Sequence, residues 1–315
     1  MTQKLAIVFP GQGSQSVGML SDLYQHDIVK NTFAEASAAL GYDLWALVAN
    51  GPEADLNETQ RTQPALLTAS VAVWRLWQQQ DGAAPAYLAG HSLGEYSALV
   101  CAGVLSLGAA VKLVEQRGNY MQQAVPAGAG GMSAIIGLDD AAIAKACAEA
   151  AEGEVVAPVN YNSPGQVVIA GHKAAVERAG ELCKAAGAKR ALPLPVSVPS
   201  HCALMRPAAE QLAADLAALS FNTPQLPVIN NVDVSIAIDS AAVKDALVRQ
   251  LYSPVRWTET IEWLAANGVT DVIELGAGKV LSGLIKRIDK NLTSSSVNDQ
   301  ASLEAALTQL TQEKQ

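Results

Sequence analysis

Short apolar runs alternate with segments of helical periodicity in the first third of the chain, and this alternation restricts the fold more than any other feature. Leu5–Phe9 is one apolar run, and residues 86–89 form a second. Helices are expected over residues 27–40, 64–80, 107–124 and from residue 95 onward. Short buried strands separated by helices pair in parallel and are covered on both faces, so the sequence predicts an α/β fold with a mainly parallel sheet.

A glycine-rich stretch over residues 126–131 is followed by a different order of elements. We expect strand, helix, strand, strand, helix and strand, which is the β-α-β-β-α-β order of a ferredoxin-like unit. These elements are expected over residues 132–138, 139–151, 155–160, 166–170, 174–186 and 189–194, with a turn at residues 162–165.

Further elements after this unit indicate that it is an insertion. A helix is expected over residues 204–219, and two more core strands over residues 227–230 and 271–275. The polar segment after Asn291 is expected to fray. We therefore predict a core made of residues 1–126 and 199–315, with residues 127–198 as an inserted subdomain.

Charge and composition exclude several kinds of partner. The chain has 315 residues, with 21 Lys and Arg against 30 Asp and Glu, so its formal net charge is −9. An acidic chain without a basic run argues against nucleic acid or an anionic membrane as a partner. No apolar stretch reaches the ~18 residues that span a bilayer, and the first run is too short for a signal peptide. We expect a cytoplasmic protein whose four cysteines are reduced and form no metal site.

The sequence from Gly90 to Gly94 reads Gly-His-Ser-Leu-Gly and fits the pattern G-x-S-x-G. It follows an apolar run and precedes a helix, which is the strand-turn-helix context that exposes a nucleophilic serine. The helix N-terminus would also offer free N–H groups to an oxyanion. An ordinary serine N-cap between two turn glycines is the alternative. The context favours Ser92 as a nucleophile.

A serine nucleophile needs a base, and the chain contains four histidines. His26 and His172 lie in polar or turn segments typical of the surface, and His91 adjoins the nucleophile in a tight turn. His201 stands just before the helix expected over residues 204–219, whose N-terminus favours a neutral imidazole. A helix-start histidine without a catalytic role remains an alternative. No Asp or Glu stands out as a third member, so a main-chain carbonyl could hold the second ring nitrogen.

Arg117 falls on the apolar stripe of the helix expected over residues 107–124. A buried cation needs an anionic partner, and a guanidinium suits a substrate carboxylate because it can form two parallel hydrogen bonds. An internal ion pair with a protein carboxylate, or a side chain that reaches solvent, is equally compatible with this spacing.

The segment Gly11, Gln12, Gly13 directly follows the first expected strand. Glycines at the carboxyl end of a strand in an α/β sheet let the backbone approach a ligand closely. Ser16 stands where a dinucleotide fingerprint would require a third glycine, so the loop is not of that type. Main-chain N–H groups near Gln12 could complete an oxyanion hole.

Five motifs carry a resemblance to a known family. They are FPGQGSQ (residues 9–15), GHSLGE (90–95), QRG (116–118), NYNSPGQ (160–166) and PSH (199–201). In this order, from Ala6 to about Arg287, the chain closely resembles the malonyl-CoA:acyl-carrier-protein transacylases of bacterial fatty acid synthesis. The resemblance implies an α/β-hydrolase-like core with an inserted ferredoxin-like subdomain.

The resemblance also implies roles for individual residues. Ser92 would be the acylated nucleophile, His201 its base and Arg117 the clamp for the malonyl carboxylate. The main-chain N–H groups of Gln12 and Leu93 would form the oxyanion hole, and the main-chain carbonyl of Gln250 would orient the imidazole. Substrate binding would also involve His91, Asn160 and Asn162.

The reaction implied is a ping-pong transfer of malonyl from malonyl-CoA to the phosphopantetheine thiol of acyl carrier protein, through malonyl-Ser92. It supplies the extender unit for fatty acid synthesis and requires no cofactor or metal. Polyketide-synthase relatives carry a His-Ala-Phe-His type of motif where this chain has residues 198–201, Val-Pro-Ser-His. Selection of malonyl is therefore assigned to Arg117 and to the likeness over the whole chain.

Two other functions use the same features. A serine thioesterase or carboxylesterase would release free malonate, and a carrier-binding scaffold with a decayed site would not be acylated. Carrier proteins of this pathway are acidic, so docking on a chain of charge −9 needs a local basic patch. The pairs Lys189-Arg190 and Lys286-Arg287 are the candidates, with ordinary solvated charges as the alternative reading.

Overall fold

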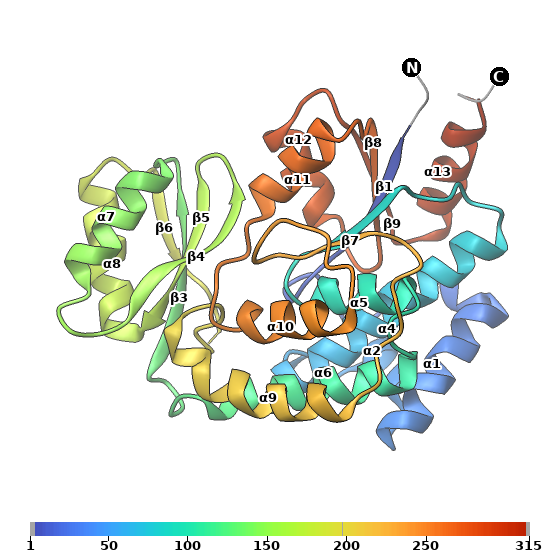
Figure 1. Cartoon of the computed structure of the whole chain (residues 1–315), viewed down its shortest axis with the longest axis horizontal. Coiled ribbons are helices and arrows are strands. Elements are labelled where there is room, and N and C mark those ends of the chain that lie inside the picture. The colour runs from blue at the N-terminus through green and yellow to red at the C-terminus, as the bar shows by residue number, and fades with distance from the viewer. Residues whose placement is uncertain (1–3, 197, 313–315) are drawn as a thin grey trace.

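Five parallel strands form the centre of the larger part of the molecule (Figure 1). The computed structural model describes residues 4–196 and 198–312. The strand order of this sheet, sheet A, is β7-β2-β1-β8-β9, and every neighbouring pair is parallel. Its strands are β1 (Leu5–Phe9), β2 (Tyr87–Gly90), β7 (Val228–Ile229), β8 (Asp271–Leu275) and β9 (Thr293–Val297).

Helices cover both faces of sheet A. In β1, Ile7 and Phe9 belong to one apolar cluster, whereas Ala6 and Val8 belong to another on the opposite face. The first cluster is formed with α1 (Asp27–Leu40), α2 (Leu44–Asn50), α4 (Thr59–Gln79), α5 (Leu93–Cys101), α6 (Leu107–Gln123), α9 (Arg206–Ala218), α10 (Ser240–Gln250) and α13 (Gln300–Gln312). The second is formed with α11 (Trp257–Ala266) and α12 (Val280–Ile288). The mainly parallel, doubly covered sheet predicted from the sequence is confirmed.

Sheet B is antiparallel and belongs to the smaller unit. Its strands β3 (Gly130–Ile136), β4 (Val156–Ser163), β5 (Gln166–His172) and β6 (Arg190–Pro193) lie in the order β4-β5-β3-β6. Two helices, α7 (Asp140–Ala150) and α8 (Lys173–Ala185), pack on one face. Along the chain the order is strand, helix, strand, strand, helix, strand, as expected.

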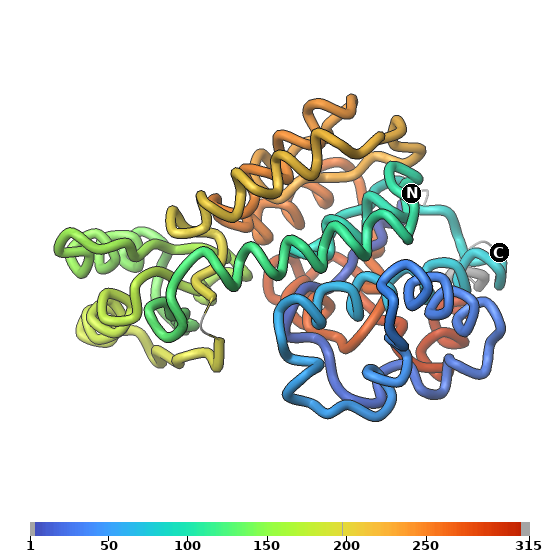
Figure 2. The backbone as a smooth tube through the Cα atoms, turned by 90° about the horizontal axis from the view of Figure 1, so that it is seen from below, coloured from blue at the N-terminus to red at the C-terminus, as the bar shows by residue number. Residues whose placement is uncertain are grey.

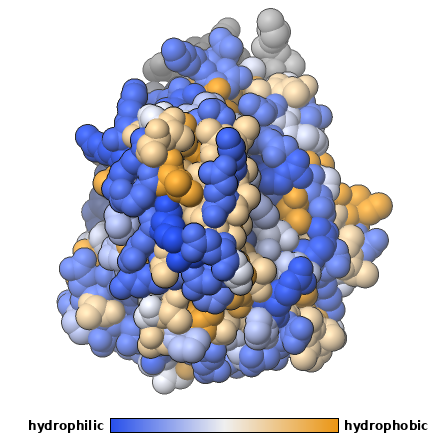
Figure 3. All heavy atoms as spheres, turned by 90° about the vertical axis from the view of Figure 1, so that its left-hand side faces the viewer, coloured by the Kyte–Doolittle hydropathy of each residue, from blue (hydrophilic) through white to orange (hydrophobic). Residues whose placement is uncertain are grey.

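The two units lie side by side, and α6 leads from the larger to the smaller (Figure 2). Strand β4 also forms main-chain hydrogen bonds with the segment before α11. Tyr161 N–H donates to the Val255 oxygen at 3.0 Å, and Val255 N–H donates to the Val159 oxygen at 2.9 Å. The outward face of the smaller unit is largely hydrophilic, with apolar side chains interspersed (Figure 3).

Several expected elements differ in extent. The segment after Asn291 forms β9 and α13 instead of fraying, because β9 pairs with the fully buried β8 along its whole length. The turn expected at residues 162–165 is shorter, since β4 continues to Ser163. Helix α4 begins at Thr59, ahead of Pro64, so the proline lies inside the helix and not at its start. The sequence analysis missed the helices α2, α10, α11 and α12, and also the short elements η1 (Leu23–Gln25), α3 (Glu53–Leu56) and η2 (Ala203–Met205). None of the described helices is long and apolar enough to cross a membrane.

Candidate active site

Ser92 lies in the sharp turn between the end of β2 and the start of α5. Its backbone has φ 52° and ψ −109°, a region that residues other than glycine rarely adopt. The Ser92 N–H donates to Asn231 Oδ1 at 2.7 Å, and Asn231 Nδ2 donates to the Gly90 oxygen at 2.7 Å. The Asn231 side chain thus holds the turn from both sides, and Ser92 lines the cavity described below.

The two glycines of the motif are required by close packing. A Cβ on Gly90 would lie 1.9 Å from the carbonyl carbon of Gly94, and a Cβ on Gly94 would lie 2.1 Å from the main-chain oxygen of Phe9. Neither contact leaves room for a side chain. The pattern G-x-S-x-G is therefore a packing requirement of this turn.

Ser92 and His201 are in hydrogen-bond contact. The serine Oγ lies 2.8 Å from His201 Nε2, and His201 Nδ1 lies 2.7 Å from the main-chain oxygen of Gln250. The carbonyl can only accept, so Nδ1 carries the proton and Nε2 is free to accept one from the serine. His201 is 3% exposed. This arrangement can deprotonate a serine hydroxyl without a third acidic residue.

Burial, reinforced by the positive charge of Arg117, lowers the pKa of His201 to about 3. The sequence analysis attributed a neutral imidazole to the start of the next helix, but these two causes dominate. Because the neutral form is the one that accepts a proton, His201 is ready to act as a base throughout the neutral range.

The imidazole of His201 is expected to stay neutral on mild acidification. Nitrogen NMR of the ring should show the Nδ1–H tautomer without a titration step from about pH 8 to about pH 5, because the buried ring gains a proton only near its lowered pKa. A titration of the His201 ring centred near the ordinary value of 6.5 would contradict this expectation.

Arg117 of α6 is 1% exposed. Its Nη1 donates to Gln63 Oε1 at 2.8 Å, and its Nη2 donates to Gln250 Oε1 at 3.0 Å and to Ser92 Oγ at 3.3 Å. Within residues 4–196 and 198–312, no carboxylate lies within ion-pair distance of it. The internal ion pair that the sequence left open is thus not formed there, and the guanidinium can still receive an anion beside the serine.

A cavity of about 620 Å³ lies between the two units and contains this site. It is lined by the predicted residues Gln12, His91, Ser92, Leu93, Arg117, Asn160, Asn162 and His201. Gln250 does not line the cavity, but it contacts two residues that do, Arg117 and His201. His91 Nε2 donates to Asn162 Oδ1 at 2.8 Å, which joins the serine turn to β4 of the smaller unit, and burial lowers the pKa of His91.

Three buried polar residues at the site were missed by the sequence analysis: Gln63, Glu95 and Asn231. Gln63 lies on the apolar face of α4, where a buried amide is a signal that some partner is required. Asn231 follows the short strand β7, at the edge of a parallel sheet where ligand-binding residues gather. Glu95 belongs to the serine motif itself, but the sequence offers no indication of its partners.

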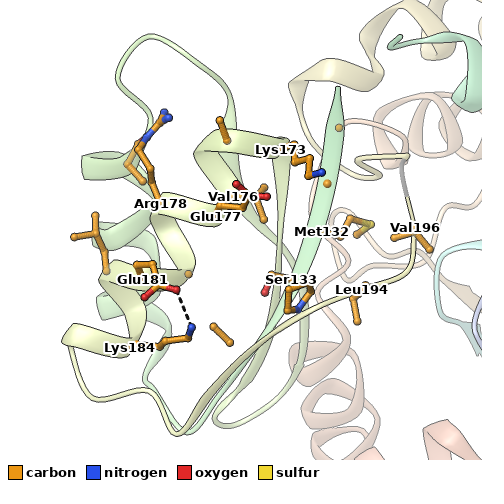
Figure 4. A pocket seen from close by; sticks show the side chains of 18 of the residues that line it. Met132, Ser133, Lys173, Val176, Glu177, Arg178, Glu181, Lys184, Leu194 and Val196 are labelled. Atoms are coloured by element: carbon orange, nitrogen blue, oxygen red, sulfur yellow. Dashed lines mark hydrogen bonds and ion pairs between the residues drawn. The ribbon is translucent and has the colours of Figure 1, made fainter. Parts of the chain in front are cut away.

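A larger cavity of about 1240 Å³ lies within the smaller unit, between α8 and sheet B (Figure 4). Two of the cations that line it are already paired: Lys184 with Glu181, and Arg178 with Glu154, each at 2.7 Å. No residue singled out in the sequence lines it. In the part of the chain that the structure describes, no group of three His, Cys, Asp or Glu could hold a metal ion.

Comparison with known proteins assigns the chain to a class. The profile of the acyl transferase domain family matches residues 6–307, so the chain is an acyltransferase. A malonyl CoA-acyl carrier protein transacylase of Salmonella typhimurium is 69% identical over 98% of this chain and 100% of its own length. The one of Bacillus subtilis is 46% identical, over 98% of each chain. The chain therefore belongs to the malonyl CoA-acyl carrier protein transacylase family.

Solved structures agree with the sequence relatives. An acyl carrier protein S-malonyltransferase from Vibrio cholerae superposes with a TM-score of 0.94, at 71% identity, and covers 96% of this chain and 99% of its own. A malonyl-transacylase in complex with its type II PKS acyl-carrier protein superposes with a TM-score of 0.97, at 62% identity, over 98% of this chain and 100% of that one.

Proposed function

We propose that this protein transfers malonyl from malonyl-CoA to the phosphopantetheine thiol of acyl carrier protein, through a malonyl-Ser92 intermediate, and so supplies the extender unit for fatty acid synthesis. The observation that carries the proposal is the buried guanidinium of Arg117, whose hydrogen-bond partners among the described residues are neutral oxygens and which lies beside a serine in contact with a neutral imidazole. The names of the relatives, which are malonyl CoA-acyl carrier protein transacylases, support the same substrates.

The first half-reaction acylates the serine. His201 Nε2 takes the proton of Ser92 as Oγ attacks the thioester carbonyl carbon of malonyl-CoA. The main-chain N–H groups of Gln12 and Leu93 stabilise the oxyanion, and Leu93 is suited to this because it begins α5. Collapse of the intermediate breaks the carbon–sulfur bond, and the CoA sulfur leaves with the proton held by His201.

The second half-reaction transfers the malonyl group to the carrier. His201 takes the proton of the phosphopantetheine thiol, the sulfur attacks the malonyl-Ser92 ester, and the serine oxygen leaves with that proton. A thioester is consumed and a thioester is formed, so the exchange is nearly balanced in free energy and needs no cofactor. In this scheme His91, Asn160 and Asn162 contact the substrate along the cavity wall.

Arg117 provides selectivity for malonyl. Its guanidinium would bind the free carboxylate of the acyl group by two parallel hydrogen bonds. The guanidinium is close enough to the reaction for this, because its Nη2 lies 3.3 Å from Ser92 Oγ. An uncharged acyl group would fill the same space and leave the buried cation without an anion, which costs ~1–3 kcal/mol or more.

The experiment that tests this function is intact-protein mass measurement after exposure to malonyl-, methylmalonyl- or acetyl-CoA. We expect a stoichiometric malonyl adduct that disappears when phosphopantetheinylated carrier is added. Steady release of free malonate without carrier would instead identify a thioesterase. Absence of any adduct would identify a non-catalytic carrier-binding protein.

We also infer the architecture that this function uses. Residues 1–126 and 199–315 are assigned to an α/β-hydrolase-like core, and residues 127–198 to an inserted ferredoxin-like subdomain. The strand order of sheet B and the position of α7 and α8 on a single face support the second assignment. One end of the insertion adjoins residue 197, which lies outside the described residues. The four free cysteines support a cytoplasmic location.

The carrier is proposed to dock on the basic pairs beside the mouth of the cavity. Arg287 Nη1 donates to Gln166 Oε1 at 2.8 Å, and Gln166 lines the cavity. In sheet B, Ile136 of β3 is paired with Arg190 of β6 on one side and with Gln166 of β5 on the other. Segments far apart in the sequence thus bring exposed arginines to the same rim. An acidic partner would find positive charge there despite the net charge of the chain.

Charge reversal on this rim is expected to weaken the carrier step alone. The variant with Lys286→Glu and Arg287→Glu should raise KM for the carrier about tenfold and leave KM for malonyl-CoA unchanged, because in this proposal the carrier, and not CoA, contacts these side chains. Lys145→Glu, on the exposed side of α7, is the matched control. Equal effects on both substrates, in steady-state kinetics at low salt, would reject this docking surface.

A further inference from the structure

Gln250, the last residue of α10, touches both the base and the cation of the site. Its main-chain oxygen accepts from His201 Nδ1 at 2.7 Å, and its side-chain Oε1 accepts from Arg117 Nη2 at 3.0 Å. The residue is fully buried. Any change in its position would therefore move the imidazole and the guanidinium together.

The carboxamide of Gln250 can satisfy its neighbours in only one of its two orientations. Its Nε2 donates to Glu95 Oε2 at 2.8 Å and to the Ser92 main-chain oxygen at 3.1 Å. In the reversed orientation, the NH₂ group would face the guanidinium donors of Arg117, and the oxygen would face a carboxylate and a carbonyl. The carboxylate of Glu95 is therefore the group that most strongly selects the orientation in which an acceptor faces Arg117.

Glu95 also reaches the nucleophile. It lies in the first turn of α5 and is 2% exposed. Its Oε2 accepts from the main-chain N–H of Asn231 at 3.0 Å, and Asn231 in turn accepts from the N–H of Ser92. Among the described residues, no lysine, arginine or histidine forms an ion pair with Glu95. Its buried carboxylate is therefore used for hydrogen bonds to the site.

We propose that Glu95 is a positioning residue of the acyl transfer reaction: it fixes the Gln250 carboxamide with its oxygen toward Arg117, and so couples recognition of the substrate carboxylate to the placement of His201. This inference rests on the proposed function. Glu95 does not touch the substrate, and it acts through Gln250 and Asn231.

The role depends on an acceptor at Oε2 more than on charge. Burial raises the pKa of Glu95 to about 7. Both described donors, Gln250 Nε2 and Asn231 N–H, face Oε2, so a proton on the other oxygen leaves these two hydrogen bonds intact. A glutamine at this position can offer its own oxygen in the same place. The conservative amide should therefore preserve the function that an apolar side chain destroys.

The test compares Glu95→Leu with Glu95→Gln, and measures acylation of Ser92 by malonyl-CoA and by acetyl-CoA. We expect Glu95→Leu to lower the ratio of the malonyl rate to the acetyl rate about tenfold, because the freed carboxamide can turn its NH₂ group toward Arg117. Glu95→Gln should stay within about threefold of the wild-type ratio. If Glu95→Leu does not fold, Glu95→Ala takes its place.

Glu274 provides a matched control. It is also a fully buried glutamate: it lies on β8, and its side chain accepts from the N–H groups of Leu281 and Ser282 at the start of α12. It lies outside the cavity. Glu274→Leu should lower thermal stability and leave the malonyl-to-acetyl ratio unchanged, so that a general loss of packing can be recognised.

A double variant isolates the path through Gln250. Gln250→Met removes the carboxamide and keeps the main-chain oxygen on His201, so it should lower the ratio as Glu95→Leu does. Adding Glu95→Leu to Gln250→Met should then cause no further decrease. A folded Glu95→Leu or Glu95→Ala variant with the wild-type ratio would overturn the role of Glu95. Absence of any malonyl adduct on the wild-type protein would instead overturn the proposed function.

Discussion

Ser92→Ala is expected to abolish acylation of the protein by malonyl-CoA, with transfer to the carrier reduced by about 10³-fold or more. No other hydroxyl is in contact with His201 Nε2 among the described residues, and the substituted side chain offers no oxygen to attack the thioester. Malonyl-CoA carrying a radiolabel, followed by precipitation of the protein, measures this directly.

Ser97→Ala is the matched control for that experiment. Ser97 lies on the same helix, α5, and is fully buried. Its hydroxyl has no hydrogen-bond partner among the described residues, so its removal should leave labelling intact. Persistent labelling of the Ser92→Ala variant would show that another nucleophile accepts the acyl group, and the proposed mechanism would be wrong.

Arg117→Ala should lower the rate of acylation by malonyl-CoA about 10²-fold and increase the relative use of acetyl-CoA, because the substrate carboxylate loses its two hydrogen bonds in a buried place. Arg117→Lys should be intermediate, since an ammonium retains the charge but not the fork. Competition between the two thioesters, followed by intact-protein mass measurement, gives the ratio.

Arg75→Ala serves as the control for Arg117. Arg75 lies on α4, and forms a partly exposed ion pair with Glu35 at 2.7 Å, away from the cavity. Its removal should change neither rate by more than a small factor. An unchanged malonyl-to-acetyl ratio in Arg117→Ala would remove the guanidinium from substrate recognition.

Much of the fold could be predicted because local pattern and burial agree. Leu5–Phe9 is a short apolar run buried along its whole length, and Asp271–Leu275 is equally buried although it carries two acidic residues among its apolar ones. Strand β9, Thr293–Val297, could not be found in this way, because it is made mostly of serine and threonine. Its place at the sheet edge comes from main-chain pairing with β8, which a local pattern does not reveal.

The site was partly predictable for a similar reason. Local pattern points to both Ser92 and Arg117, because Ser92 stands in a G-x-S-x-G motif between a strand and a helix and Arg117 falls on the apolar stripe of its helix. Local pattern cannot identify the partners of Glu95, because Gln250 is 155 residues away in the sequence and Asn231 is 136 residues away. Contact between these three residues depends on how α5, α10 and the end of β7 pack together. A local sequence pattern does not predict that packing.

The main-chain bonds between β4 and the segment at Val255 have a consequence for access to the serine. Val255 both donates and accepts a main-chain hydrogen bond with β4. The larger and the smaller unit are therefore joined by main-chain hydrogen bonds along one side. We expect these bonds to resist separation of the two units on that side, so that a substrate arm reaching Ser92 would pass along the existing cavity. Discrimination between substrate arms would then depend on how well each arm fits the cavity between the two units.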